Sequence, residues 1–338
     1  MDIERKLIKR ASLGKLVEQL RAEGKVVLAP KKKKNVVFFE PINTIDEMST
    51  DYIATTQSPK AAAFPKSDRI LKFENGKEGI KFEGQPTSVY PETVVLGLRP
   101  CDATGFDSLT AIFNWDYKDQ LYNDRLAKTT FIGISCASCD AYCFCTSVKG
   151  GPGNTHGTDI LLTAVDGGDF LAEIVSEKGK KLAVSGQQYF EADSGADKEK
   201  FLANVPVKFD VDTLVPKAQN SFESPVWLEQ SLRCIGCGAC AYVCPTCACF
   251  DMQDETTGSK GQRVRCWDSC GFGLFTLHTS GHNPREVQSA RWRQRVLHKF
   301  SYMPERLNVV GCIGCGRCSR ACPVDMNLSE HLVNLAEA

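Results

Sequence analysis

Residues 233–245 read RCIGCGACAYVCP, and their four cysteines follow the spacing C-x2-C-x2-C-x3-C-P. The same spacing returns in residues 311–323, which read GCIGCGRCSRACP. It is typical of two-cluster ferredoxins, in which three cysteines of a run hold one [4Fe–4S] cluster and the fourth ligates the other cluster. We therefore expect two [4Fe–4S] clusters with crossed ligands. The predicted ligands are Cys234, Cys237, Cys240 and Cys322 for one cluster, and Cys312, Cys315, Cys318 and Cys244 for the other.

A tetrahedral zinc site is the simpler alternative for clustered cysteines. Zinc is satisfied by four ligands in two CxxC pairs, whereas two four-cysteine runs that each end in proline exceed what it needs. The glycines between the cysteines also favour clusters, because they let the backbone approach a cluster closely and direct N–H groups at its sulfur atoms. We therefore interpret both runs as iron–sulfur ligands.

The composition describes an ordinary globular protein with many cysteines. The chain has 338 residues, 42% of them hydrophobic, and a formal net charge of +0, which allows two or three domains and argues against nucleic acid as a partner. Its 17 cysteines lie in tight groups, which indicates metal ligands in a reducing compartment rather than disulfides. The first residues lack an export signal, and no apolar run approaches the roughly 20 residues that span a bilayer. We expect a cytoplasmic protein without direct membrane insertion.

Two apolar segments predict buried strands in the N-terminal part. Residues 93–98 (TVVLGL) and 129–134 (TTFIGI) flank a stretch with helical spacing, residues 103–113. Such a βαβ unit belongs to a sheet with parallel strands, and ligands then sit beyond the carboxyl ends of the strands. Cys101 follows the first strand and Cys136 follows the second.

Nine cysteines remain outside the two runs. Four soft ligands at the rim of the sheet predict a third iron–sulfur cluster, and the alternative is a set of buried free thiols. These four are Cys101, Cys136, Cys143 and Cys145. Cys139 lies in the same loop and is expected to be spare.

A second set of cysteines directly follows the first run and comprises Cys247, Cys249, Cys266 and Cys270. Three interpretations stay open for this set. It holds a fourth cluster, it completes the third cluster across the domain boundary, or it contains a redox-active thiol pair. Metal ligation is the interpretation we favour.

Residues 285–300 (REVQSARWRQRVLHKF) predict a basic helix between the two runs. Reduced clusters with four thiolate ligands are anionic, so nearby positive charge should raise their reduction potentials. A solvated face is the ordinary alternative. We nevertheless expect Arg293 or Arg295 to lie near a cluster or a partner subunit, with Trp292 and Val296 anchoring the opposite side.

Together these patterns predict two domains. Residues 1–222 form an α/β domain with a mixed or parallel sheet, which carries the extra cluster at its strand ends. Residues 223–338 form an α-helical ferredoxin domain with two [4Fe–4S] clusters, and an insertion at about 250–310 separates its cysteine runs.

Several separate motifs, spread over nearly the whole chain, carry a resemblance to a known family. They are RPCD at 99–102, SC at 135–136, YCFC at 142–145, the first run extended by CPTCAC at 244–249, WDSC at 267–270, GHNPR at 281–285, and the run that starts at Cys312. In these motifs the chain resembles the beta subunits of cytoplasmic sulfhydrogenases ([NiFe] hydrogenase/sulfur reductase) and the 4Fe-4S dicluster subunits of anaerobic sulfite reductases. The resemblance implies that Cys101, Cys136, Cys143, Cys145, Cys247, Cys249 and Cys270 are ligands. It does not regularly include Cys139 or Cys266.

The resemblance also implies a function. Proteins of this kind relay electrons between a flavin subunit that uses NAD(P)H and a catalytic subunit, which is a hydrogenase, a sulfite or sulfur reductase, or a heterodisulfide-reductase-type module. We find no nucleophile with an evident base in the sequence and assign no catalytic residue. The alternative function is a catalytic subunit that reduces a small sulfur compound at Cys247, Cys249 and Cys270.

Overall fold

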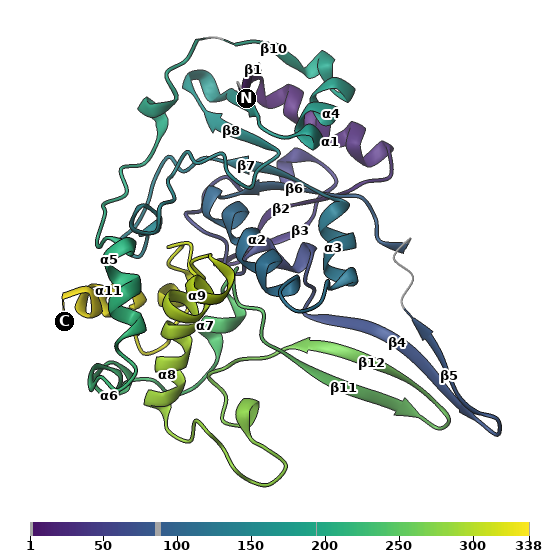
Figure 1. Cartoon of the computed structure of the whole chain (residues 1–338). Coiled ribbons are helices and arrows are strands. Elements are labelled where there is room, and N and C mark those ends of the chain that lie inside the picture. The colour runs from purple at the N-terminus through teal and green to yellow at the C-terminus, as the bar shows by residue number, and fades with distance from the viewer. Residues whose placement is uncertain (1–2, 85–88, 194, 338) are drawn as a thin grey trace.

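The computed structural model describes residues 3–84, 89–193 and 195–337. Figure 1 shows a large sheet with helices on its two faces, a group of short helices beside it, and a smaller sheet that projects from the body. Within the described residues, no helix is both long and apolar enough to cross a membrane.

The larger sheet has eight strands in the order β10-β1-β9-β8-β7-β6-β2-β3. They are β1 (Glu4–Ile8), β2 (Val26–Lys33), β3 (Val36–Pro41), β6 (Thr93–Leu98), β7 (Thr129–Ile134), β8 (Ile160–Ala164), β9 (Phe170–Ile174) and β10 (Phe190–Ala192). The four central strands β2, β6, β7 and β8 run parallel, and the outer pairs are antiparallel. The expected mixed α/β N-terminal part is therefore confirmed.

Helices cover both faces of this sheet, which explains why its central strands are apolar throughout. They are α1 (Arg10–Ala22), α2 (Pro100–Phe113), α3 (Gln120–Ala127) and α4 (Glu177–Ser185). Val94 and Leu96 of β6 pack in one core with α1, whereas Val95 packs in the other with α2. This is the alternation expected of neighbouring strand residues.

A bulge at Gly97 directs the end of β6. The register with β7 shifts between Leu96 and Leu98, so that Leu98 joins the same core as Val95. Gly97 has φ +86°, and a Cβ there would lie 2.9 Å from Met48 Cε, so only glycine fits. Bulges of this kind turn a strand and re-aim the residues that follow it, which here include Cys101.

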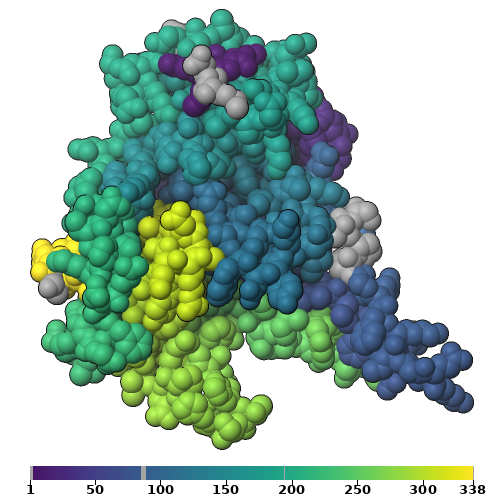
Figure 2. Space-filling view, in the orientation of Figure 1, coloured from purple at the N-terminus to yellow at the C-terminus, as the bar shows by residue number. Residues whose placement is uncertain are grey.

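The smaller sheet, named the arm, joins segments that are far apart in the sequence. Its strands are β4 (Ser67–Gly76), β5 (Gly79–Gly84), β11 (Phe250–Thr257) and β12 (Lys260–Trp267), in the order β11-β12-β4-β5. All neighbours are antiparallel, and the arm projects from the body in Figures 1 and 2. The expected boundary at residue 222 stays a prediction, because β12 of the second part pairs with β4 of the first.

The C-terminal part consists mainly of short helices around an apolar core of its own. These are α5 (Val211–Gln219), α6 (Val226–Ser231), α7 (Ala239–Tyr242), α8 (Gln288–Leu297), α9 (Met303–Leu307), α10 (Arg317–Arg320) and α11 (Leu328–Glu337). A π-helical turn, His298–Tyr302, joins α8 to α9. The predicted basic helix is therefore present, while the strands β11 and β12 in the same insertion were not expected.

Candidate iron–sulfur centre

The two cysteine runs meet at a cavity in the helical part. Its walls contain three cysteines of the first run and the last cysteine of the second, which we name the first group: Cys234, Cys237, Cys240 and Cys322. Cys270 and Cys318 also line this cavity. The loop of the first run turns through Gly236 and Gly238, whose φ angles are +68° and +72°. The structure thus brings Cys322 to the cysteines that the crossed spacing assigns to it.

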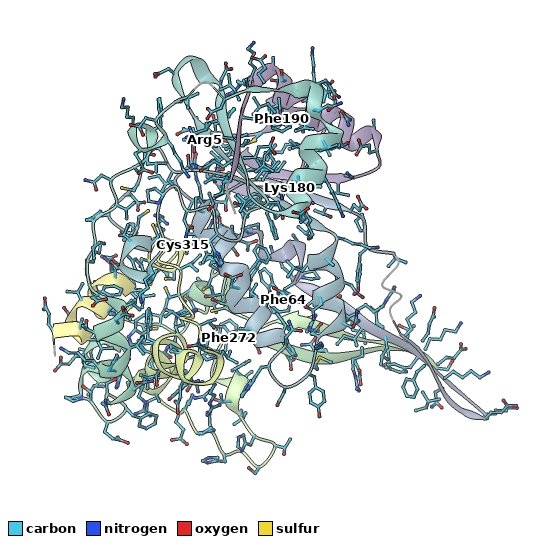
Figure 3. All side chains as sticks on the ribbon, turned by 45° about the horizontal axis from the view of Figure 1, so that its top comes forward. Arg5, Phe64, Lys180, Phe190, Phe272 and Cys315 are labelled. Carbon is cyan, nitrogen blue, oxygen red and sulfur yellow. The ribbon has the colours of Figure 1, made fainter. Side chains whose placement is uncertain are left out.

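The second group consists of Cys244, Cys312, Cys315 and Cys318. Burial raises the pKa of Cys312 to about 12, and the neighbouring thiolates of Cys318 and Cys244 act in the same direction. Burial likewise raises the pKa of Cys315 to about 11, again with Cys244 and Cys318 as neighbours. Cys244 of the first run therefore lies among the cysteines of the second. Figure 3 labels Cys315 at the side of the helical part that faces the larger sheet.

Two glycines of the second run hold it against the loop that follows β7. Gly314 and Gly316 have φ angles of +64° and +69°, and a Cβ on them would lie 2.5 Å from Phe144 O and 2.4 Å from Tyr142 O. The Phe144 N–H also donates a hydrogen bond of 2.9 Å to Gly314 O. The contact is so close that no larger residue fits at either position.

The third group, Cys101, Cys136, Cys143 and Cys145, gathers at the carboxyl ends of β6 and β7. Burial raises the pKa of Cys145 to about 12, and the thiolates of Cys136 and Cys143 add to this shift. Burial also raises the pKa of Cys101, with smaller contributions from Asp102, Cys315 and Cys136. The third group therefore adjoins the second through Cys101 and Cys315.

A buried ion pair fixes that junction. Arg317 of α10 reaches both carboxylate oxygens of Asp102 in α2, at 2.5 and 2.7 Å, and donates to Thr55 O at 2.8 Å. The side chains of Arg317 and Asp102 are 2% and 1% exposed. A buried ion pair that loses one partner costs about 3–5 kcal/mol, so this pair strongly constrains how α10 sits on α2.

A second arginine of α10 holds the loop that carries Cys143. Arg320 bonds both carboxylate oxygens of Asp140 at 2.6 and 2.7 Å and donates to Cys143 Sγ at 3.2 Å. It also donates to Cys315 O at 2.7 Å. One guanidinium group therefore contacts both the second and the third group.

The fourth group, Cys247, Cys249 and Cys270, forms thiol pairs. A hydrogen bond from Cys249 lowers the pKa of Cys270 to about 6, and a hydrogen bond from Cys247 lowers the pKa of Cys244. Cys270 also lines the first cavity. The fourth group therefore touches both the first and the second.

The two cysteines expected to be spare lie apart from the four groups. Cys139 Sγ donates to Asn204 O at 3.4 Å, and Cys266 Sγ lies 3.7 Å from Ser67 Oγ.

The basic helix turns three cations toward the cysteines. Arg295 donates to Cys240 O at 2.9 Å and to Cys247 Sγ at 3.4 Å. Lys299 donates to Cys244 Sγ at 3.4 Å and to Gly311 O at 2.7 Å, and Arg291 lines the first cavity. Burial opposes the charge of Arg295 and Lys299, but the neighbouring thiolates outweigh it and raise the pKa of both.

The expectation for Arg295 therefore matches its position, whereas Arg293 points elsewhere. Arg293 stacks on the Phe222 ring, 3.8 Å from its centroid, and bonds Phe222 O. Trp292 and Val296 are buried in the helical core, as expected of anchors.

Sequence reasoning missed Lys60, which belongs to the N-terminal part. This buried side chain donates to Cys247 O at 2.8 Å and lies 4.0 Å from the centroid of the Trp267 ring. Burial lowers its pKa, and the thiolates of Cys247, Cys244 and Cys249 oppose that shift. A lone lysine in a proline-rich loop carries no signal that could have revealed this role.

The donor set suits iron–sulfur clusters. Among the described residues, no group of three or more His, Cys, Asp or Glu side chains is arranged to hold a metal ion. The first group instead surrounds a shared space, and its donors are thiols, which are the soft ligands that iron–sulfur clusters take. N–H donors also point at the sulfur atoms, from Gln288 to Cys234 at 3.2 Å and from Met326 to Cys322 at 3.3 Å. Such donors tune cluster potentials.

Comparisons with known proteins agree with this chemistry. A family model described as a 4Fe-4S dicluster domain matches residues 233–326, which include both runs. The chain is also 30% identical over 319 residues to sulfhydrogenase 2 subunit beta of Pyrococcus furiosus, a match that covers 92% of this chain and 91% of that protein. The similarity therefore extends through the N-terminal part as well.

We expect the substitution Arg295→Gln to lower the reduction potential of at least one cluster. A buried positive charge beside thiolates stabilises the reduced, more anionic form, and Gln removes that charge. Anaerobic redox titration followed by electron paramagnetic resonance measures the change. Arg295→Lys keeps the charge and should restore most of the potential, and Arg293→Gln on the outer side is the matched control. A potential unchanged by Arg295→Gln would contradict the tuning role.

Proposed function

The chain belongs to the family of sulfhydrogenase beta subunits, and from this membership we propose that it is the iron–sulfur electron-transfer subunit of a cytoplasmic multi-subunit oxidoreductase. It relays electrons between a flavin subunit that uses NAD(P)H and a catalytic subunit of the hydrogenase, sulfite or sulfur reductase, or heterodisulfide-reductase type. The observation that carries this proposal is the unbroken succession of cysteine groups from the sheet edge to the helical part.

We assign two [4Fe–4S] clusters to the first and second groups. The first group would hold one cluster through Cys234, Cys237, Cys240 and Cys322, and the second group would hold the other through Cys312, Cys315, Cys318 and Cys244. The shared cavity of the first group supports the first assignment. The position of Cys244 among the thiols of the second run supports the second.

We assign a third iron–sulfur cluster to Cys101, Cys136, Cys143 and Cys145. Their convergence from three segments supports this assignment, since buried free thiols need no such gathering. Cys247, Cys249 and Cys270 lie beside Cys244, and we propose metal ligation for them as well, as part of a fourth cluster. Their distance in the fold from the sheet edge gives no support to a shared cluster with the third group.

Electron relay follows from the order of the groups. Cys101 of the third group neighbours Cys315 of the second, and Cys318 of the second neighbours Cys240 of the first. Electron transfer slows steeply with distance, so neighbouring clusters pass electrons faster than separated ones. The residues of the chain hold the clusters in sequence, supply positive charge and exclude water, while the clusters supply the redox chemistry.

A second candidate function is thiol-based reduction of a small sulfur compound at Cys247, Cys249 and Cys270. The lowered pKa of Cys270, about 6, favours it, because a thiolate is the nucleophilic form. However, Cys270 is buried, which hinders the approach of a substrate to its sulfur atom. We therefore place this function second.

The proposed function predicts which activities the isolated chain lacks. The chain purified alone under anaerobic conditions should exchange electrons with viologen dyes, but it should neither oxidise NAD(P)H nor reduce sulfur compounds. The complex purified from its native host should do both through other subunits. Turnover of a sulfur compound by the isolated chain, lost in Cys270→Ser, would instead support the thiol-based function.

The cluster assignments predict the iron content. Each [4Fe–4S] cluster contributes four irons, so three or four clusters give about twelve to sixteen irons per chain, with equal sulfide. Anaerobic purification followed by iron and sulfide analysis measures both. A value of about eight would leave only the two clusters of the cysteine runs and would remove the third cluster.

Crossed ligation predicts the effect of Cys322→Ser. This substitution should alter the cluster of Cys234, Cys237 and Cys240, although Cys322 belongs to the other run. Electron paramagnetic resonance of the reduced protein, compared with Cys237→Ser, would show the same signal perturbed in both variants. Cys139→Ser and Cys266→Ser should leave all signals unchanged. If Cys322→Ser perturbed the same signal as Cys312→Ser instead, the crossed assignment would be wrong.

A further inference from the structure

Cys237 reaches the protein surface. All 17 cysteines lie in the described residues, and Cys237 alone among them is exposed. It also lines the first cavity. Of the cysteine groups, the first group is therefore the one with a ligand at the surface.

Exposed apolar side chains surround this position. Five of them, each 61–79% exposed, come from α6, from the segment that joins it to the first run, and from residues 271–287: Leu228, Leu232, Ile235, Leu274 and Val287. We name Cys237 and these five residues the Cys237 face. Soluble proteins rarely gather apolar residues on a surface without an interaction partner.

The segments of the Cys237 face pack against one another. A Cβ on Gly238 would lie 2.5 Å from the Phe272 ring, and one on Gly236 would lie 3.1 Å from Gln288 Oε1. Arg291 donates to Phe272 O at 2.8 Å, and α6 packs on α8. In Figures 1 and 2 these segments lie together at the end of the molecule opposite β1 and β10, and Figure 3 labels Phe272 in the same region.

The charges beside the face are balanced. Arg233 and Arg285 accompany Glu229 and Glu286 in the same segments. A partner selected by electrostatic attraction would meet an excess of one sign. The centre of a stable protein interface is instead apolar and poor in charge, as this face is.

We propose that the Cys237 face is the docking surface for the redox subunit that exchanges electrons with the cluster of the first group, an inference that rests on the proposed function. The occupant presents its own electron carrier beneath an apolar surface. Contact there brings the two carriers close together and excludes water from the space between them. The third group, at the sheet edge, then lies at the other end of the relay.

The test uses the full complex, purified through a tag on this chain from cells that make all subunits. Leu232→Asp and Leu274→Asp, made singly and together, place charge on the face without touching a cysteine. We expect partner binding to weaken by about tenfold or more, as for substitutions at the centre of an interface. Iron content and dye reduction by the isolated chain should stay at wild-type values, which shows that the variants fold.

Phe82→Asp on the arm is the matched control, because Phe82 is 69% exposed and lies far from the first group. It should leave partner binding unchanged. Wild-type assembly and turnover of the Leu232→Asp/Leu274→Asp complex would overturn the proposal. So would a chain that forms dimers through this face, seen as a change from two copies to one in the variants while partner binding persists. If the wild-type chain recovered none of the redox subunits, the proposed function itself would fail.

Discussion

The contact between Arg317 and Asp102 connects the two halves of the cysteine array. Both side chains are almost fully buried, and a buried charge is tolerated only beside a well-placed opposite charge. The pair therefore permits one arrangement of α10 on α2. Because Cys101 precedes Asp102 and Cys315 precedes Arg317 by two positions, this arrangement also sets the third group beside the second. The relay across the two parts of the chain depends on it.

Positive charge and thiolates depend on each other in the same way. Arg295 and Lys299 are buried among cysteine sulfurs, where burial alone would disfavour their charged forms. The thiolates reverse that tendency, and the cations in turn stabilise anionic thiolates and reduced clusters. Lys60 extends this arrangement from the N-terminal part to Cys247. The reduction potentials of the clusters therefore depend on residues from both parts.

The arm and the close glycine contacts add further connections between the two parts. The hairpin of β11 and β12 starts directly after Cys249 and ends three residues before Cys270, and it pairs with β4 of the N-terminal part. Gly314 and Gly316 pack against the loop that carries Cys143 and Cys145. The second, third and fourth groups are thus held by backbone contacts as well as by charge, as clusters at fixed separations require.

The sequence by itself determined what depends on short spacing. The two cysteine runs, the glycines within them and the strands 93–98 and 129–134 are local patterns, since ligand spacing and side-chain periodicity act over a few residues. The neighbours of Arg295 among the cysteines, the role of Lys60, the arm and the exposure of Cys237 were decided only by the tertiary structure. Each of these depends on contacts between residues far apart in the chain or on what covers a surface, and no local periodicity records such contacts. The cysteine types predicted the chemistry, whereas packing between distant segments decided which thiols meet, which cations face them and which one reaches the surface.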